Sequence, residues 1–415
     1  MVPQATLFLA FLLSLIISVP VFSGSREASA SEELFPVFPG LEPAVEFWKL
    51  VFTRYGASEL IFHDPLEPTK IYEVLEVGEN NAPRGLIEAE RQRILLDNEL
   101  GTDEKRVRIQ RGVKERFLSG LRLSRRYLGQ IQHIFMEHGV PADLAYLPLV
   151  ESAFNIRARS RVGAVGMWQF MPATGKKFLR ISSTLDERKD PLESSRAAAR
   201  FLKQNFQVLG NWPLAITAYN HGREGMLRAV SEVGSRDLME IIQQYRGPAF
   251  GFASRNFYAE FLAALDLAKR GEEFFPDLQY HSPFPLKELE LKRAISIQSL
   301  LKPTPVSRNE FLEWNPALSP KIRQIPSGYR VKLPPEKSEI FLAAFRHAFG
   351  TAAVERSAEP ISQNSAASTR HRVARGETLS KIAKTYRISV HEIRRANNLD
   401  STHLIAGQHL KIPPR

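Results

Sequence analysis

Residues 141–152 read PADLAYLPLVES. Its first residue is a proline, which suits the first turn of a helix. Leu144, Leu147 and Glu151 then fall at i, i+3 and i+7, so we expect a helix with all three side chains on one face. The stretch therefore predicts a carboxyl group on an apolar stripe.

The predicted surroundings of Glu151 favour a chemical role for its carboxyl group. Burial disfavours the charged form, so a carboxyl group in apolar surroundings keeps its proton to higher pH. A general acid that works near neutral pH needs this property. Glu151 is therefore a candidate general acid. The alternative is a Glu at the edge of the stripe whose carboxylate reaches solvent.

The loop that follows Glu151 is basic. No Asp or Glu occurs between Ser152 and Thr184, whereas six Lys and Arg residues do. A lone acid facing a basic loop suggests an anionic substrate held over that acid. Gly163 and Gly166 would let the backbone approach such a ligand closely. The alternative is an ordinary solvated loop.

Three motifs occur in order: ESAFN from residue 151, GAVGMWQFMP from residue 163 and AYNHG from residue 218. Together they resemble the motifs of the lytic murein transglycosylases of the soluble lytic transglycosylase type. The resemblance covers residues 117–270 well and the remainder loosely. It implies a mainly α-helical, goose-type lysozyme-like fold. It also implies cleavage of the MurNAc–GlcNAc bond of peptidoglycan with a 1,6-anhydro product.

The resemblance assigns roles to single residues. Glu151 becomes the sole catalytic acid/base. The expected substrate-binding residues are Ser160, Gln169, Met171, Tyr219 and Asn220. The family usually has a Thr-Arg turn before a Tyr, where this chain reads SRNFY from residue 254, so the far rim of the site is less constrained. No cofactor or metal is expected. His133 and His138 are five residues apart and do not share a helix face.

Two aspartates stand before the next predicted helix. Asp190 can be its N-cap, with Pro191 as the first helical residue and Glu193 as the partner in a capping box. The functional alternative makes Asp186 or Asp190 a second catalytic carboxylate. We expect the capping role, which leaves Glu151 without a carboxylate partner.

The amino-terminal residues indicate export. An almost wholly apolar run precedes small residues, which predicts a signal peptide over residues 1–23 and a location in the periplasm or cell envelope. The run is also just long enough for an uncleaved membrane anchor. The chain has no Cys, so neither a disulfide nor a Cys-linked lipid is available. Residues 31–115 are expected to form a helical extension before a catalytic domain over residues 116–270.

Two carboxy-terminal segments repeat one pattern. The first reads FLEWNPAL and then VKLPP; the second reads IRRANNL and then LKIPP. The second copy, residues 371–414, resembles a LysM module, a βααβ unit that binds GlcNAc-containing glycans. The first, residues 285–335, lacks the GETL turn and is expected to keep the fold without dependable sugar binding. Residues 351–370 between them are expected to be a flexible linker.

The LysM resemblance implies four glycan-binding residues: Gly376, Thr378, Leu379 and Ile405. The module also has more Lys and Arg than Asp and Glu. This excess favours attraction to anionic wall polymers, although ordinary solubility explains it equally well.

The whole chain carries a net charge of +11, which fits nucleic acid, an anionic membrane or an anionic cell wall. Among these partners, the motifs indicate peptidoglycan. We expect a monomer without a nucleic-acid partner. Two alternatives stay open. One is a hydrolytic muramidase on the same fold, whose second carboxylate would come from Asp186, Asp190 or Glu224. The other is a non-catalytic wall-binding protein.

Overall fold

The computed structural model describes residues 34–78, 83–350, 354–356, 369–374, 377–386, 388–397, 399, 404 and 408–412. The predicted signal peptide lies outside these residues, as does most of the predicted linker. The described part of the chain is mainly α-helical, as expected. None of its helices combines the length and apolar character needed to cross a membrane.

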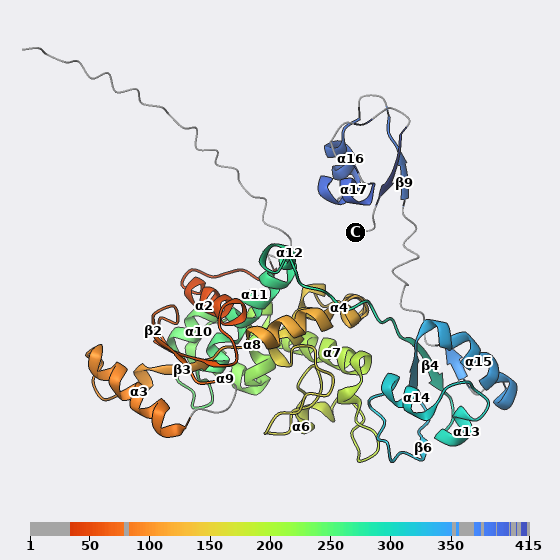
Figure 1. The fold of residues 1–415 in the computed structure, drawn as a ribbon, viewed down its shortest axis with the longest axis horizontal. Helices are drawn as coiled ribbons and strands as arrows, with labels where there is room; N and C mark the ends of the chain where they lie inside the picture. Colours follow the sequence, from red (N-terminus) through yellow and green to blue (C-terminus); the bar gives the residue numbers. More distant parts are fainter. Residues whose placement is uncertain are drawn as a thin grey trace, which may run out of the picture. The chain divides into compact units, whose positions relative to one another are not determined.

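Four helices build the centre of the body: α4 (Lys114–Glu137), α7 (Pro191–Leu209), α8 (Trp212–His221) and α11 (Phe252–Lys269). Helix α7 packs against α4 and α8, and α8 packs against α11 (Figure 1). Helix α4 buries Phe117, Leu121, Ile131 and Phe135 in the core. Further helices complete the body: α6 (Pro172–Gly175), η3 (Glu187–Lys189), α9 (Arg223–Val233), α10 (Leu238–Gln244) and α12 (Gly271–Phe274).

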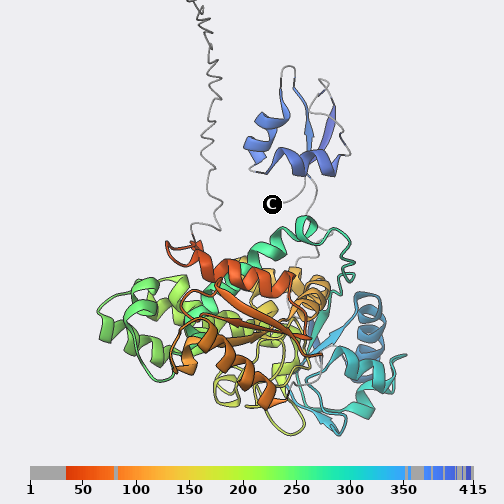
Figure 2. The ribbon, with the colours of Figure 1, turned by 60° about the vertical axis from the view of Figure 1, so that its left-hand side comes forward.

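The region before α4 is not the all-helical extension that we expected. It contains α2 (Glu42–Thr53), α3 (Arg84–Asp97), the short η1 (Glu104–Arg106) and a sheet of β1 (Glu59–His63), β2 (Ile71–Glu76) and β3 (Arg108–Arg111). The strand order is β2-β1-β3 and both pairings are antiparallel; Figure 2 shows the sheet beside α2. Four of the five residues of the central strand β1 are buried, so its sequence lacks the alternation of apolar and polar residues that identifies a half-buried strand.

The helix expected from residue 141 is interrupted. The chain forms a 3₁₀ helix, η2 (Ala142–Tyr146), and then a single α-helical turn, α5 (Pro148–Glu151). Pro148 causes the break, because it has no N–H to continue the backbone hydrogen bonds and it occupies the first position of a new turn. Leu144 and Leu147 are nevertheless buried, so the predicted apolar stripe exists.

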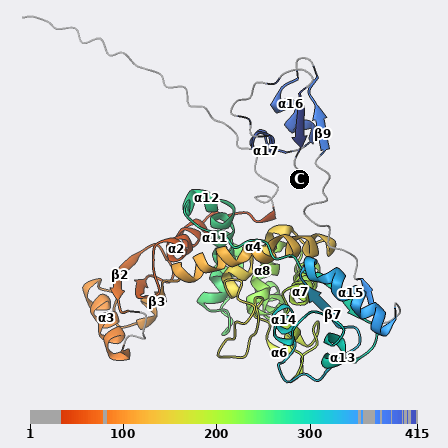
Figure 3. The ribbon, with the colours of Figure 1, turned by 45° about the vertical axis from the view of Figure 1, so that its right-hand side comes forward.

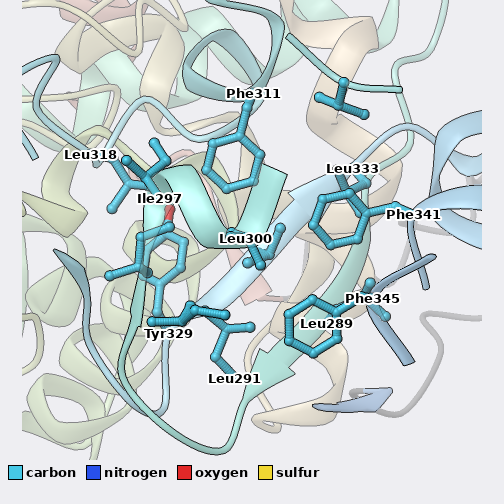
Figure 4. Packing of buried hydrophobic residues seen from close by; sticks show 14 of the residues in the cluster. Leu289, Leu291, Ile297, Leu300, Phe311, Leu318, Tyr329, Leu333, Phe341 and Phe345 are labelled. Atoms are coloured by element: carbon cyan, nitrogen blue, oxygen red, sulfur yellow. The ribbon is translucent and has the colours of Figure 1, made fainter. Parts of the chain in front are cut away.

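The first repeat forms a βααβ unit with its own core. It comprises β4 (Lys287–Leu291), β5 (Ile295–Ser296), α13 (Ile297–Leu301), α14 (Arg308–Trp314), β6 (Gln324–Ile325) and β7 (Arg330–Leu333), followed by α15 (Pro335–Phe349) and β8 (Val354–Arg356). Strand β4 pairs with both β7 and β8, and β5 pairs with β6. Figure 4 shows the packing, in which Phe311, Leu333 and Phe341 surround Leu300.

The second copy repeats this architecture with β9 (Thr369–Arg372), α16 (Leu379–Tyr386), α17 (Val390–Ala396) and β10 (His409–Ile412) (Figure 3). The two copies share hydrogen bonds as well as sequence. Asn315 accepts from the backbone N–H of Lys332 and donates to its carbonyl. Asn397 makes the same pair of bonds with Lys411. The sequence repeat is therefore also a structural repeat.

Buried ion pairs join the first repeat to the central body. Lys332 of β7 has no exposed surface, and its Nζ lies 2.7 Å from Asp190 Oδ2, 3.2 Å from Glu193 Oε1 and 3.5 Å from Glu288 Oε1. Arg196 of α7 pairs with Glu288 as well. Burial opposes the charge on Lys332, but the surrounding carboxylates raise its pKa above the usual value. The repeat is therefore a fixed part of the body that carries Glu151.

A second contact involves the loop before α7. The backbone N–H of Asp186 donates to Ala317 O over 2.8 Å, and that of Ser319 donates to Thr184 O over 2.9 Å. Leu185 belongs to the core of the first repeat. The segment between α14 and β7, which precedes the last strand of the repeat, therefore packs on the central body.

Candidate active site

Glu151 lies at the end of α5, where the chain turns sharply. Ala153 and Phe154 both have positive φ values, 53° and 58°. Helix α4 approaches this turn closely, since a Cβ at Gly120 would lie 2.9 Å from Ala153 Cα. Only glycine allows that approach. Arg116 of α4 also donates to the Glu151 carbonyl over 3.3 Å, so α4 fixes the backbone that carries the acid.

The loop after Glu151 is held by buried hydrogen bonds. Ser152 Oγ donates to Met167 O over 2.7 Å, and the indole of buried Trp168 donates to Ser195 Oγ of α7 over 2.9 Å. Gly166 has φ 84°, and a Cβ there would lie 1.8 Å from Arg188 O. The glycine thus serves close packing of the loop onto η3, and not only the ligand approach that we expected.

Tyr219 of α8 reaches the same place. Its hydroxyl donates to Trp168 O over 2.8 Å, which ties α8 to the loop next to Glu151. Burial and then the charge of Glu151 raise the pKa of Tyr219 well above its usual value. The hydroxyl therefore stays protonated and remains a hydrogen-bond donor.

The carboxyl group of Glu151 has the property that a general acid needs. Burial raises its pKa to about 8, although the positive charge of Arg116 acts in the opposite direction. The side chain forms no hydrogen bond or ion pair with other described residues. At neutral pH the resting carboxyl group therefore carries its proton.

A second carboxyl group, Glu260 of α11, belongs to the same cluster, and sequence reasoning missed it. Helix α11 packs against α5. Burial, followed by the charge of Glu151, raises the pKa of Glu260 to about 8. The prediction that Glu151 lacks a carboxyl neighbour is therefore wrong. The available sequence signal was an acid flanked by Ala259 and Phe261 within the apolar middle of α11.

The three other acids considered as second carboxylates have structural or surface roles. Asp190 caps α7, accepting from the N–H groups of Leu192 and Glu193 over 2.9 Å each, and its other oxygen pairs with Lys332. Asp186 caps η3 and pairs with Arg188. Glu224 is exposed and pairs with Arg223.

Comparisons with known proteins support two domain assignments. Residues 132–242 match the family model "Transglycosylase SLT domain", and residues 371–413 match "LysM domain". The chain contains an SLT domain and a LysM domain. The SLT match spans Glu151, the loop around Gln169 and Tyr219, but ends before Glu260 of α11.

The chain is homologous to membrane-bound lytic murein transglycosylase D of Escherichia coli K12, with 25% identity over 280 residues. The match covers 66% of this chain and 61% of that protein, so the chain spans about three fifths of its relative. A putative tributyltin chloride resistance protein of Alteromonas sp. M-1 is 38% identical over 112 residues, which are 26% of this chain and 54% of that protein. The crystal structure of the E. coli soluble lytic transglycosylase SLT70 matches with 23% identity and a TM-score of 0.28, over 35% of this chain and 24% of that one.

The remaining predicted residues of the SLT domain have varied environments. Gln169 has φ 47° and its Nε2 donates to Gly166 O over 2.8 Å. Met171 is 41% exposed. Asn220 Oδ1 accepts from Ser254 Oγ over 3.0 Å, so the serine of the divergent SRNFY segment holds α8 to α11. Ser160 Oγ accepts from the N–H of Ala164 over 2.9 Å, which stabilises its own loop.

Two predicted glycan contacts of the LysM domain, Gly376 and Ile405, lie outside the described residues. Thr378 is exposed at the start of α16. Leu379 requires a correction, because its side chain is 1% exposed and packs with Ile382 and Ile393 in the core of the module. The resemblance alone does not distinguish an apolar residue that contacts glycan from one that packs in the core of the module.

The loop between Ser152 and Thr184 presents its positive charges to solvent. Arg157, Arg159, Arg161, Lys176 and Lys177 are all exposed. Within the described residues, no cluster of three or more His, Cys, Asp or Glu side chains could hold a metal ion. The surroundings of Glu151 therefore combine a protonated acid with a cationic surface.

Proposed function

We propose that the protein is a lytic transglycosylase that cleaves the β-1,4 bond between MurNAc and GlcNAc in peptidoglycan. The observation that carries the proposal is the protonated carboxyl group of Glu151, held beside Tyr219 within an SLT domain. The relative named lytic murein transglycosylase D and the LysM domain support a murein substrate.

The proposed reaction uses Glu151 twice. Its carboxyl group first donates a proton to the glycosidic oxygen as the bond to the anomeric carbon breaks. The resulting carboxylate then takes a proton from the C6 hydroxyl of MurNAc as that oxygen attacks the anomeric carbon. An intramolecular hydroxyl reaches an effective molarity of about 10⁵ M or more, so ring closure outcompetes attack by water. The acetamido group of the substrate would stabilise the positive centre, as in substrate-assisted glycosidases.

Hydrolysis on the same fold is a second candidate because of Glu260, a carboxyl group on the neighbouring helix. An inverting glycosidase needs an ionised second carboxylate to activate water. Burial and the charge of Glu151 raise the pKa of Glu260 to about 8, so at neutral pH this group is a poor base. The balance therefore favours the anhydro product over the muramidase product.

The other domains would bring the enzyme to its substrate. The LysM domain would bind glycan strands of the wall, with Gly376, Thr378 and Ile405 as contacts. The cationic surface near Glu151 would attract the anionic wall. Export to the periplasm or cell envelope, through the apolar segment at residues 1–23 acting as signal or anchor, fits the membrane-bound relative. The enzyme would act as a monomer without cofactor.

Substitution of Glu151 tests the proposal. Glu151→Gln keeps the shape of the side chain and removes proton transfer, so the rate of peptidoglycan clearance should fall at least about 10²-fold. Glu240→Gln, which changes an exposed glutamate of α10, is the matched control and should clear peptidoglycan normally. Near-normal clearance by folded E151Q would refute the assignment and favour a non-catalytic wall-binding protein.

A further inference from the structure

A pocket that contains none of the residues of the proposed reaction lies between the amino-terminal sheet and the start of α11. Residues of β3 and of the segment before it form one wall, and Phe250, Phe252 and Arg255 form the other. Its volume is about 630 Å³. This size is ordinary for a site that binds a small ligand or one part of a larger ligand. The pocket is therefore large enough for more than a single ion.

The charged lining of the pocket has an excess of cations. It comprises four cations and one acid: Arg91, Lys105, Arg108, Arg255 and Glu104. Glu104 lies 3.5 Å from Arg91, which also pairs with Glu88 over 2.8 Å. The other three cations have no ion pair with any described residue. The expected ligand is therefore an anion.

Arg108 of β3 is held by an aromatic ring and not by a carboxylate. The carbon of its guanidinium lies 3.9 Å from the centre of the Phe252 ring, within the range of a cation–π contact. Its Nε is buried and has no hydrogen-bond partner among the described residues. A buried N–H without a partner costs free energy, so this guanidinium has hydrogen-bonding capacity that the described structure leaves unused.

Arg255 of α11 is fixed by the backbone that precedes this helix. Its Nε donates to Phe250 O over 3.2 Å, and its Nη2 donates to Tyr245 O over 3.1 Å. Carbonyl groups are uncharged, so these bonds orient the side chain without neutralising its charge. Arg255 and Arg108 therefore bring two positive charges to one pocket from elements far apart in the sequence. Two like charges held in one place favour the binding of an anion there.

The start of α11 also connects the pocket to the active site. Ser254, which precedes Arg255, donates to Asn220 of α8 over 3.0 Å. Asn220 is a predicted substrate contact, and α11 packs against α5, which ends at Glu151. A glycan strand bound along Asn220 would therefore run next to the first turn of α11 and bring its side groups to the pocket.

We propose that this pocket binds a free carboxylate of the peptide stems that peptidoglycan carries on MurNAc. The inference rests on the proposed function and adds to it a specificity site for the stem. An arginine fork donates two parallel N–H bonds to a carboxylate, which a lysine cannot do. Apolar walls from Val107, Ile109 and Phe250 suit the aliphatic parts of a peptide. The pocket would therefore favour glycan strands that still carry their stems.

The first test compares kcat and KM on two soluble glycan substrates, one with peptide stems and one from which the stems have been removed. Arg108→Gln should raise KM for the stem-bearing chains at least about 10-fold, because a charged hydrogen bond is lost, and should leave kcat unchanged. Neither parameter should change on the stripped chains. Arg106→Gln removes an exposed cation of the same segment outside the pocket, so it is the matched control and should behave like the unsubstituted protein.

Two results with R108Q would overturn the proposal. An unchanged KM on stem-bearing chains would mean that Arg108 does not contact the stem. Equal losses on both substrates would mean that Arg108 only supports the fold. Lys105→Gln covers the case in which R108Q does not fold, because Lys105 is exposed. Its KM should rise about two- to threefold on stem-bearing chains alone, and an unchanged KM would then contradict the proposal.

A binding measurement separates this inference from the proposed function. Isothermal titration calorimetry of full-length E151Q measures the binding of a synthetic stem peptide, of the same peptide with amidated carboxyl groups, and of inorganic phosphate. The free peptide should bind, whereas amidation of the peptide or addition of R108Q should weaken binding at least about 10-fold. No binding of the free peptide, or equal binding of the amidated peptide or of phosphate, would refute the carboxylate site. Binding that depends on Arg108, in a protein whose unsubstituted form cleaves no glycan, would instead refute the proposed function alone.

Discussion

Glu151 combines a fixed backbone with a carboxyl group that has no partner among the described residues. Arg116 and the close approach at Gly120 hold the turn, whereas no described residue neutralises the acid. An ion pair or a hydrogen bond to the charged form would have lowered the pKa of the carboxyl group. The absence of such a partner in the described structure explains how a glutamate can be a proton donor at neutral pH.

The raised pKa of Glu151 predicts the direction of the pH dependence. The protonated carboxyl group is the active form in bond cleavage, and burial raises its pKa to about 8. The value of kcat/KM should therefore be high below this pH and should fall as pH rises through it. Steady-state rates on soluble glycan chains, measured between about pH 5 and 10, test this fall in kcat/KM. A fall centred near pH 4.5, the ordinary range of glutamate, would contradict the described environment.

Among the elements, the buried Lys332 of β7 is a central contact between the first repeat and the SLT domain. Lys332→Ala would leave Asp190 and Glu288 without this partner in a site closed to water. Removal of one member of a buried ion pair costs about 3–5 kcal/mol of the free energy of unfolding. Chemical denaturation followed by tryptophan fluorescence measures the change.

The internal repeat supplies the control for that prediction. Lys411 occupies the equivalent position of the LysM domain, but its side chain is exposed. Lys411→Ala should change the free energy of unfolding by no more than about 0.5 kcal/mol. Equal effects of K332A and K411A would mean that the contacts of Lys332 do not stabilise the joined body.

A local signal in the sequence predicted the start of α7 well, because Asp190 and Pro191 mark it. The capping side chain accepts from backbone N–H groups within a few residues, so no distant partner is needed. The Glu151 motif was recognisable for another reason, because its residue types and their spacing are specific.

Features that depend on distant contacts were not predictable. No sequence pattern near Lys332 indicates that Asp190 is its partner. No pattern near Glu260 indicates that Glu151 is its neighbour. The two members of each pair meet only after the chain has packed α7 against β7 or α11 against α5. The sheet of β1 was also missed, since a strand buried on both faces lacks the alternation that identifies a surface strand.

At the scale of the whole molecule, the two repeats have different roles. The first is joined to the SLT domain by buried ion pairs, and the second follows residues predicted to be a linker. A LysM domain on such a linker would act as a tether that raises the local concentration of the catalytic site at the wall. Integration of one copy and tethering of the other would explain why the duplicated sequences diverged.

Truncation tests the tether. A chain that ends after Arg356 keeps β8, which pairs with β4 and completes the sheet of the first repeat. It should cleave short soluble glycan chains at nearly the rate of the full chain. On insoluble wall it should bind more weakly and clear the wall more slowly, most visibly at low enzyme concentration. Loss of activity on soluble chains by the folded truncated protein would instead place the LysM domain in the active site.

Mass spectrometry of the products released from purified peptidoglycan shows which oxygen attacks the anomeric carbon. If Glu151 takes a proton from the C6 hydroxyl while Glu260 stays neutral, most products should end in 1,6-anhydro-MurNAc. Each is then lighter by one water than its hydrolytic counterpart, and E151Q should release neither kind. Products that end mainly in reducing MurNAc would contradict the account, because they would mean that water, and not the C6 hydroxyl, attacks the anomeric carbon.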